Sequence, residues 1–432
     1  MNEMIKKADL LDRMLAAENL SRYSYTLSES EKQELNIENG DFKLMRTVFN
    51  RSGFLKVFLG DRMGSARGND TTEEGLARLI RDSRAAAESS PEDPCHGIAP
   101  DQGKDVFRQG AEEPDLDRFA ERIRELLDTI AADYPLVRVM AAIGSFDRRH
   151  WISRTTSGTE FEGFGGQYGF FLEICATDGE KTTGLDYTGF SAESLDRPLI
   201  EAGDVRRHLE DIQNSISPRA LEGKFEGTVI MTPGCAAEFL QMLIGNYMES
   251  RVIMDGTSLW LNRIGEQVAG EGLTVSLDPF DPRIVGGERA TPDGFRAEKV
   301  TLIEKGILRS HFLSLYAANR TGRPVTKNSG SGLVIEAGGT PLAEMVASLD
   351  RGLILGGFSG GAPGTNGEFS GVAKNSFLVE HGKVTAAVTE TMVNGNLGEI
   401  FRKIRAISRE LTCDGEAVVP YIAVDGMVIS GK

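Results

Sequence analysis

The sequence is poor in the features that mark several classes of protein. It has four cysteines in 432 residues, and none forms a Cys-x-x-Cys pair. Widely spaced cysteines without such a pair are typical of reduced thiols in a cytoplasmic protein. No apolar run approaches the ~18 residues of a membrane span, and the N-terminal residues lack the apolar core of a secretory signal. We therefore expect a cytoplasmic protein with no membrane partner.

Positive charge is also scarce. Lys and Arg together number 48 against 64 Asp and Glu, so the formal charge is −16. No run of basic residues is longer than two. An acidic surface repels the phosphate backbone of nucleic acids and anionic lipid headgroups. We expect no direct contact with nucleic acid.

Histidine is too scattered to predict a metal site. No two of the five histidines have the spacing of three to five residues that a helical zinc site needs. We interpret each as a surface or core residue. The five are His96, His150, His208, His311 and His381.

The length of the chain predicts at least two domains. We expect an α+β fold, with an N-terminal domain (1–220) of helices and an antiparallel meander and a β-rich C-terminal domain (221–432) with short helices. Residues 91–115 read as a loop, and Ser52-Gly53 reads as a turn between strands. Apolar periodicity predicts helices at 3–17, 75–89, 116–130, 203–215, 234–250, 310–321 and 396–407.

Two residues are candidate nucleophiles. Ser359 lies in a G-x-S-x-G pattern with His381 downstream, but the residues after it cannot begin the helix that a nucleophile elbow requires. Cys235 lies at the start of a predicted helix, where the dipole can stabilise a thiolate. The competing interpretations are a Gly-rich loop and a buried small residue. An enzyme that uses either residue stays open as an alternative.

Several long segments resemble the TldD/PmbA family, also called the modulator of DNA gyrase family. The resemblance covers nearly the whole chain, including "KVFLGDRMGSARGND" in its first part. In the second part it rests on "FEGTVIMTPGCAAEFLQMLIGN", "DGTSLWLNRIGEQVAGEGLTVSLDP", "GTNGEFSGVAKNSFLVEHGKV" and "TETMVNGNLGEIFRKIRAIS".

The resemblance implies a degenerate metal motif. TldD-type chains of this family carry an H-E-x-x-x-H zinc motif on a helix, whereas PmbA-type (TldE) chains resemble the same fold without it. Aligned with that motif, Gln241 takes the place of the first His, Met242 of the Glu and Asn246 of the second His, and Glu249 matches an acidic residue just beyond. Amides bind zinc poorly and a thioether cannot accept a proton. We therefore expect no metal and no catalytic residue here, and we interpret Cys413 as a chance match to a further ligand of TldD-type chains.

The resemblance also implies partners. The leading hypothesis is a non-catalytic, zinc-free PmbA/TldE-type subunit that pairs with a TldD-type chain in a peptide-degrading metallopeptidase, with zinc only in that partner. The alternative is a homodimer that binds peptides without cutting them. The acidic balance gives no support to direct contact with DNA.

The Gly-rich segment 356–371 has two open interpretations. It either contacts an extended peptide by strand addition or forms tight turns between strands. The candidate peptide-contacting residues are Gly360, Gly361, Asn366, Gly367, Phe369 and Ser370.

Overall fold

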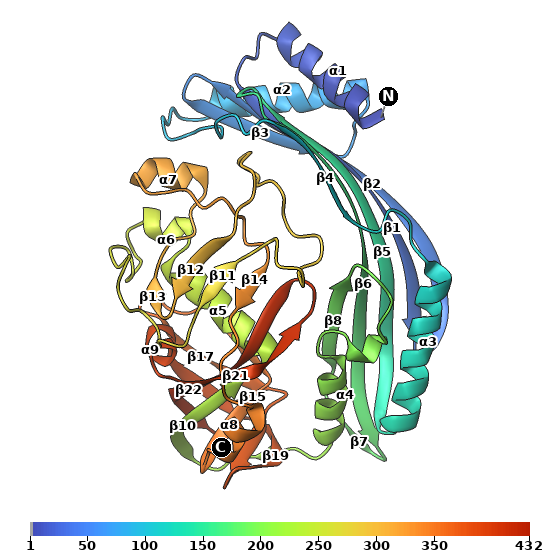
Figure 1. Ribbon diagram of the computed structural model, residues 1–432, viewed down its shortest axis with the longest axis vertical. Helices are drawn as coiled ribbons and strands as arrows, with labels where there is room; N and C mark the ends of the chain where they lie inside the picture. The colour runs from blue at the N-terminus through green and yellow to red at the C-terminus, as the bar shows by residue number, and fades with distance from the viewer. Residues whose placement is uncertain (1–2) are drawn as a thin grey trace.

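The computed structural model describes residues 3–432 as two β-sheet units that lie side by side (Figure 1). The first unit is built on an eight-stranded sheet and the second on a fourteen-stranded sheet. Helices pack against both, so the predicted α+β class, with a β-rich second half, is confirmed. The first sheet ends at Ala192 and the second begins at Arg219. The domain boundary at residue 220 stays a prediction.

The first unit comprises residues 3 to 214. Its strand order is β3-β2-β1-β5-β6-β4, with β7 and β8 also paired to β6. In chain order its elements are α1 (Glu3–Ala17), β1 (Tyr23–Glu38), β2 (Asp41–Leu59), β3 (Arg62–Gly68), α2 (Glu73–Ser89), β4 (Lys104–Gly110), α3 (Leu116–Asp133), β5 (Val137–Thr155), β6 (Glu160–Asp178), β7 (Lys181–Thr182), β8 (Asp186–Ala192), the 3₁₀ turn η1 (Leu199–Glu201) and α4 (Val205–Asn214).

The outer face of this curved sheet is covered only at its two ends. Tyr25 and Leu27 on β1 pack against α1 and α2, and Phe146 on β5 packs against α3. Because side chains alternate along a strand, Glu29 and Glu31 point to the same outer face as Leu27. They lie between the two helical layers. The inner face of the sheet curves toward the second unit (Figure 1).

Two local predictions in the first unit are wrong. β2 runs without a break through Ser52-Gly53, because Gly53 lies beneath α2, where a Cβ atom would be 3.1 Å from the side chain of Leu79. Residues 104–110 are not loop but strand β4, which pairs in parallel with β6. That pairing depends on a partner some fifty residues away in sequence, so local pattern could not reveal it.

The second unit carries the remaining elements. Its main strand order is β13-β12-β11-β14-β22-β10-β15-β18-β19-β9; β20 and β21 pair with β22, and β16-β17 join through β20. In chain order they are β9 (Arg219–Ala220), β10 (Lys224–Met231), α5 (Pro233–Tyr247), α6 (Ser250–Met254), β11 (Val275–Leu277), β12 (Val300–Glu304), β13 (Ile307–Leu308), α7 (Leu315–Thr321), β14 (Leu333–Ile335), α8 (Leu342–Ala347), β15 (Arg351–Leu355), β16 (Gly357–Gly360), β17 (Glu368–Lys374), β18 (Phe377–Glu380), β19 (Lys383–Thr389), β20 (Met392–Asn396), α9 (Leu397–Arg402), β21 (Ile404–Cys413) and β22 (Ala417–Ser430).

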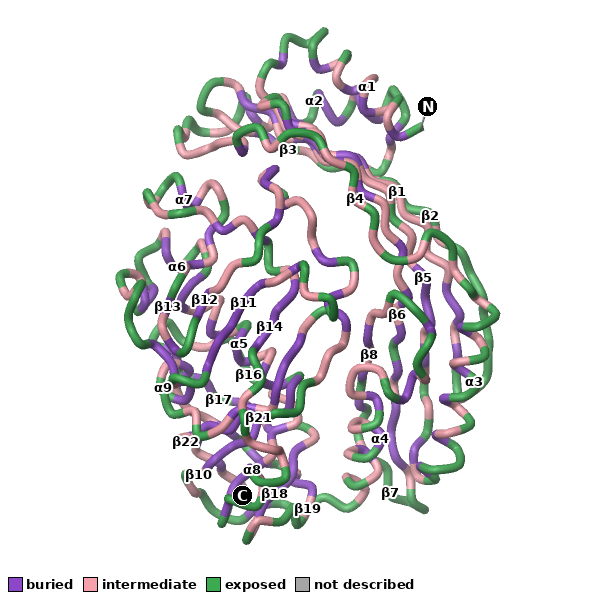
Figure 2. Tube along the Cα trace, viewed as in Figure 1, coloured by how far each residue is buried: buried purple, intermediate pink, exposed green. Residues whose placement is uncertain are grey.

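The core of the second unit forms around α5. Buried residues lie mainly along the strands of the two units, whereas turns at their edges are exposed (Figure 2). The seven predicted helices are all present, and only the short α6 and α8 had not been expected as separate helices. Across residues 3–432, no helix is both long and apolar enough to cross a bilayer.

Candidate functional site

Helix α5 is a regular helix with a buried apolar face. Thr232 is its N-cap and Pro233 occupies its first turn, as predicted. Phe239, Leu240 and Leu243 are fully buried, so the helix is anchored in the core. It continues as α-helix through Tyr247 without interruption.

The four positions aligned with the metal motif do not converge on one point. Gln241 and Glu249 are exposed, whereas Met242 is half-buried and packs against the core. A five-residue step turns an ideal helix by roughly 140° between Gln241 and Asn246, so the two amides leave the helix on different sides. Among residues 3–432, the Nδ2 atom of Asn246 is buried without a hydrogen-bond partner. Glu249 is the N-cap residue of α6.

Three aromatic rings join α5 to the Gly-rich segment. Phe239 meets the ring of Phe358 on β16 at 5.2 Å and the ring of Phe369 on β17 at 5.1 Å, both edge-on. Burial raises the pKa of Glu238, although the backbone N–H of Phe358 donates to its carboxylate. α5 and the Gly-rich segment therefore pack against each other. Local sequence pattern could not predict this contact, because the two segments are far apart in sequence.

The Gly-rich segment contains both a strand edge and a set of turns. Within the described chain, β16 pairs with β17 alone, and on its other edge the backbone N–H of Phe358 donates to Glu238. The turn that follows is held by a hydrogen bond of 2.8 Å from Asn396 Nδ2 to the carbonyl oxygen of Asn366. Gly367 has φ +87°, and a Cβ atom there would lie 1.9 Å from the hydroxyl oxygen of Tyr247. Glycine is thus required by the close approach of α5.

A cavity of about 640 Å³ opens beside this segment. Of the predicted residues, Gly361, Phe369 and Ser370 line it, whereas Gly360, Asn366 and Gly367 do not. No sequence pattern singles out the other polar residues that line the cavity, which come from β17, β20 and α9. They are Glu368, Asn394, Asn396 and Glu399. Peptide contact at this segment stays a prediction.

The candidate nucleophiles lie in unsuitable surroundings. Cys235 is fully buried, and burial raises the pKa of its thiol well above the usual value. Ser359 lies within strand β16, so no strand–turn–helix elbow forms. His381 lies on the β18–β19 turn, where its Nδ1 is 2.8 Å from a carboxylate oxygen of Asp350. Cys413 packs against Ile284 in a separate cluster and donates to the backbone carbonyl of Arg283.

The described chain offers no obvious cation site. Within residues 3–432, no three His, Cys, Asp or Glu side chains come close enough together to hold a metal ion.

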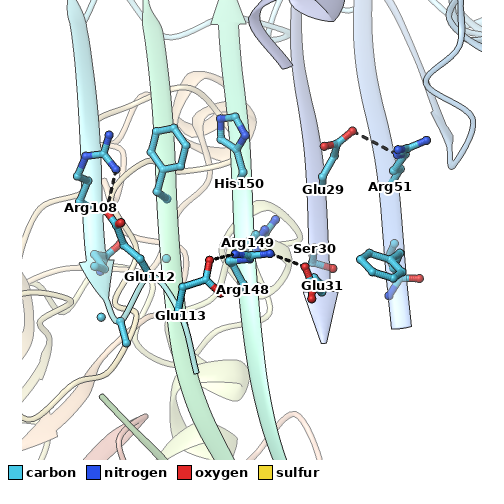
Figure 3. A pocket seen from close by; sticks show the side chains of 17 residues that line it. Glu29, Ser30, Glu31, Arg51, Arg108, Glu112, Glu113, Arg148, Arg149 and His150 are labelled. Atoms are coloured by element: carbon cyan, nitrogen blue, oxygen red, sulfur yellow. Dashed lines mark hydrogen bonds and ion pairs between the residues drawn. The ribbon is translucent and has the colours of Figure 1, made fainter. Parts of the chain in front are cut away.

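A second cavity, of about 580 Å³, lies on the uncovered outer face of the first sheet (Figure 3). The ring of Phe164 packs between Arg108 and His150. The guanidinium carbon of Arg108 lies 4.5 Å from the centroid of the Phe164 ring, and the centroid of the His150 ring lies 4.2 Å from it. Arg148 pairs at 2.5 Å with both Glu31 and Glu113. Because the register sets these partners, the sequence could not single them out. We call this cavity the outer groove.

A buried charge network joins the two units. His208 Nδ1 lies 2.5 Å from Asp186, whose other oxygen accepts from Asn375 of the second unit at 2.6 Å. Burial favours the neutral imidazole, yet the carboxylates of Asp186 and Asp204 outweigh it and raise the pKa of His208 to about 9. The network holds the units together and borders a cavity at the N-terminus of α5.

Each of the two units contains a segment that matches a known family model. Residues 223–431 match the model described as the PmbA/TldA metallopeptidase C-terminal domain, and residues 26–87 match PmbA/TldA metallopeptidase domain 1. Together the two matches cover more than half of the chain.

Individual relatives are distant but span nearly the whole chain. Metalloprotease PmbA of Escherichia coli O157:H7 is 26% identical over 413 residues, which cover 89% of this chain and 87% of that protein. A metalloprotease of Methanocaldococcus jannaschii is 23% identical, over 92% of this chain and 91% of its own length.

Solved structures have the same fold. TldE of Thermococcus kodakarensis superimposes with a TM-score of 0.84 at 20% identity, over 98% of this chain and 100% of that one. A Bacteroides thetaiotaomicron protein named as a modulator of DNA gyrase gives 0.83 at 20% identity, over the full length of both chains.

Proposed function

Because the chain belongs to the PmbA/TldD metallopeptidase family, we propose that it is a non-catalytic, zinc-free subunit of PmbA/TldE type. It pairs with a TldD-type chain in the cytoplasm, and the two together process peptides. The observation that carries this proposal is the donor set on α5: Gln241, Met242 and Asn246, which we align with the metal motif of TldD-type chains, are two amides and a thioether.

The chemistry of these side chains does not fit a zinc ion. Zinc in proteins is held by thiolate, imidazole or carboxylate, and neutral amides are weak substitutes. Gln241 is exposed to solvent, and the buried Nδ2 of Asn246 is a donor, which cannot ligate a cation. A thioether at position 242 cannot take a proton from water. We therefore derive no hydrolytic step at this helix.

The peptide-facing surface in this proposal is the adjoining cavity together with the outer edge of β16, apart from Phe358, whose N–H donates to Glu238. An extended peptide adds to such an edge through main-chain hydrogen bonds, while neighbouring pockets read its side chains. Glu368 and Glu399 are the charged residues that line the cavity. This favours peptides with a basic side chain or a free amino terminus there.

The partner-facing surface in this proposal is the free half of β2. β3 pairs only with Gly53–Leu59, so Asp41–Ser52 form an open edge. Its exposed apolar side chains are Phe42, Leu44, Met45 and Phe49. Natural sheets usually blunt such an edge with charge. Here the two arginines of this segment do not protect the edge, because Arg46 pairs with Glu34 and Arg51 pairs with Glu29, both on the neighbouring strand β1. Phe49 also lines the outer groove, so edge and groove form one surface.

Co-purification with the TldD-type relative from the same organism tests the proposal. We expect a stable complex that contains zinc and cleaves unfolded peptides, whereas this chain alone does neither. The double variant Met45→Lys/Phe49→Lys should break the complex without unfolding the chain, since both residues are exposed. Val106→Lys, an exposed position on the opposite edge strand β4, is the matched control and should leave the complex intact.

The alternative function is a homodimer that captures peptides without cutting them. The two free edges favour it as well, because both belong to this chain alone. A homodimer that persists in the presence of the TldD-type relative, and that binds peptides with no gain of hydrolysis, would replace the heterodimer proposal.

A further inference from the structure

A small polar cavity lies on the inner face of the first sheet, opposite the outer groove. Its volume is about 270 Å³, below the ~300–1,000 Å³ of pockets for drug-sized ligands. Asp147, Arg149 and Trp151 of β5 line it, and Glu193 and Gly286 close it from the second half of the first unit and from the second unit. We call it the inner cavity. Its size restricts any occupant to a small molecule.

The inner cavity exists because β6 carries glycines, which have no side chains, at the positions beneath it. In the β5–β6 register, Trp151 lies opposite Gly163 and Arg149 opposite Gly165. The indole of Trp151 covers Gly163, where a Cβ atom would be 2.2 Å from the ring. Nothing covers Gly165 in the same way, since a Cβ atom there would meet only a backbone oxygen at 3.7 Å. The open space therefore lies directly beside Arg149.

Two charged side chains face this space, and neither is held by a direct contact. Across residues 3–432, neither Asp147 nor Arg149 forms a side-chain hydrogen bond or an ion pair. Arg148, which points to the other face, is paired at 2.5 Å with two glutamates. Lys32, opposite Asp147 on β1, is paired with Glu34 at 3.3 Å. Asp147 is also half-buried, and its burial raises the pKa of the carboxyl group even though the charges of Lys32 and Arg149 oppose that rise.

The spacing of the two strand positions favours one class of ligand. Asp147 and Arg149 are two residues apart on one strand, so their backbones are separated by about 7 Å. The ammonium and carboxylate of a free amino acid are on adjacent bonds and too close to reach both groups. One further residue adds about 3.5 Å of chain, which suits a dipeptide.

We propose that the inner cavity binds a dipeptide as a zwitterion. Arg149 receives the carboxylate through its forked donors, and Asp147 with Glu193 receives the ammonium group. Trp151 offers an apolar wall to one side chain. This inference does not rest on the zinc-free subunit role, because it uses a different face and only this chain.

Calorimetric titration of the isolated full-length chain tests the inference. Glycyl-phenylalanine should bind saturably, and its N-acetylated form, its C-terminal amide and free phenylalanine should each bind at least tenfold more weakly. Arg149→Gln should lower the affinity at least tenfold. Arg148→Gln, the same change one residue away on the opposite face, is the matched control and should bind as the wild type does.

A second variant tests the open space beside Arg149 without changing any charge. Gly165→Val fills the space beside Arg149 in a strand that accepts β-branched residues, and it should abolish binding while the chain keeps its wild-type circular dichroism. Absence of saturable binding of the dipeptide would overturn the inference, as would equal affinities of Arg149→Gln and Arg148→Gln. Equal binding of free phenylalanine would overturn the dipeptide class. The assay contains no partner chain and no metal, so its failure leaves the subunit proposal standing, and the reverse also holds.

Discussion

A hydrogen bond between Asp186 and Asn375 links the two units of the molecule. Nδ2 of Asn375, in the second unit, donates to a carboxylate oxygen of Asp186, in the first, at 2.6 Å. The other oxygen of Asp186 faces His208 on α4 at 2.5 Å. One buried carboxylate thus joins the first sheet, the helix that follows it and the β17–β18 turn of the second unit. The contact between the units therefore depends on the charge state of this network.

The first prediction is a loss of stability at high pH. The pKa of His208 is raised to about 9 in the folded chain, above its ordinary value of 6.5. A raised pKa contributes stability that is complete below 6.5 and is lost as the pH rises through 9. About 3 kcal/mol should disappear between pH 6 and pH 10, since the shift from 6.5 to about 9 is worth ~1.4 kcal/mol for each pKa unit.

Urea unfolding at several pH values measures this loss. His208→Gln should be less stable than the wild type at pH 6 and should show a flatter dependence on pH. His381→Gln, at an exposed turn, is the control and should follow the wild-type curve. A wild-type curve without a decline between pH 6 and pH 10 would contradict the role given to His208.

The second prediction concerns the close approach of α5 to the Gly-rich turn. Gly367→Ala should destabilise the chain by more than ~1 kcal/mol, because φ is +87° and the new Cβ atom would collide with the Tyr247 hydroxyl. Tyr247→Phe removes that oxygen. In a double-mutant cycle measured by thermal unfolding, it should recover the steric part of the loss and leave the backbone part. Strict additivity of the two substitutions would contradict this contact.

The third prediction concerns the unsatisfied amide on α5. Asn246→Leu replaces a buried donor that has no partner with an apolar side chain of similar size. Its free energy of unfolding should be unchanged or higher by ~1 kcal/mol, since removing an unsatisfied polar group relieves a desolvation penalty. Asn246→Asp is the matched comparison and should be destabilising, because it places a charge in the same position. A large loss of stability in Asn246→Leu would show that the amide has a partner.

Local sequence pattern predicted the helices well, because their spacing of apolar residues is set within a single segment. α3 is an example: Phe119, Ile123, Leu126 and Ile130 are all buried along one stripe, as their spacing predicted. β4 could not be predicted, because its strand character comes from parallel pairing with β6. The break expected at Gly53 failed for a similar reason, since the glycine serves packing against α2 and does not form a turn.

The site was predicted only in part, for the same physical reason. The pattern located α5 and the Gly-rich segment but not their contact, which runs through Phe239 and Phe358, residues far apart in sequence. Neighbours such as Arg148 and Arg149 are alike in sequence, yet Arg148 lines the outer groove alone whereas Arg149 also lines the inner cavity. Which cation is paired and which is free can be decided only from the folded sheet.

In the proposed zinc-free subunit, α5 holds no metal ion. Zinc content of the purified chain, measured alone and in complex with its TldD-type relative, tests that claim directly. We expect well under one zinc per chain in the isolated protein, and about one zinc per heterodimer that follows the partner when the subunits are separated. One zinc per isolated chain, lost in a Gln241→Ala/Asn246→Ala variant together with peptide hydrolysis, would contradict it.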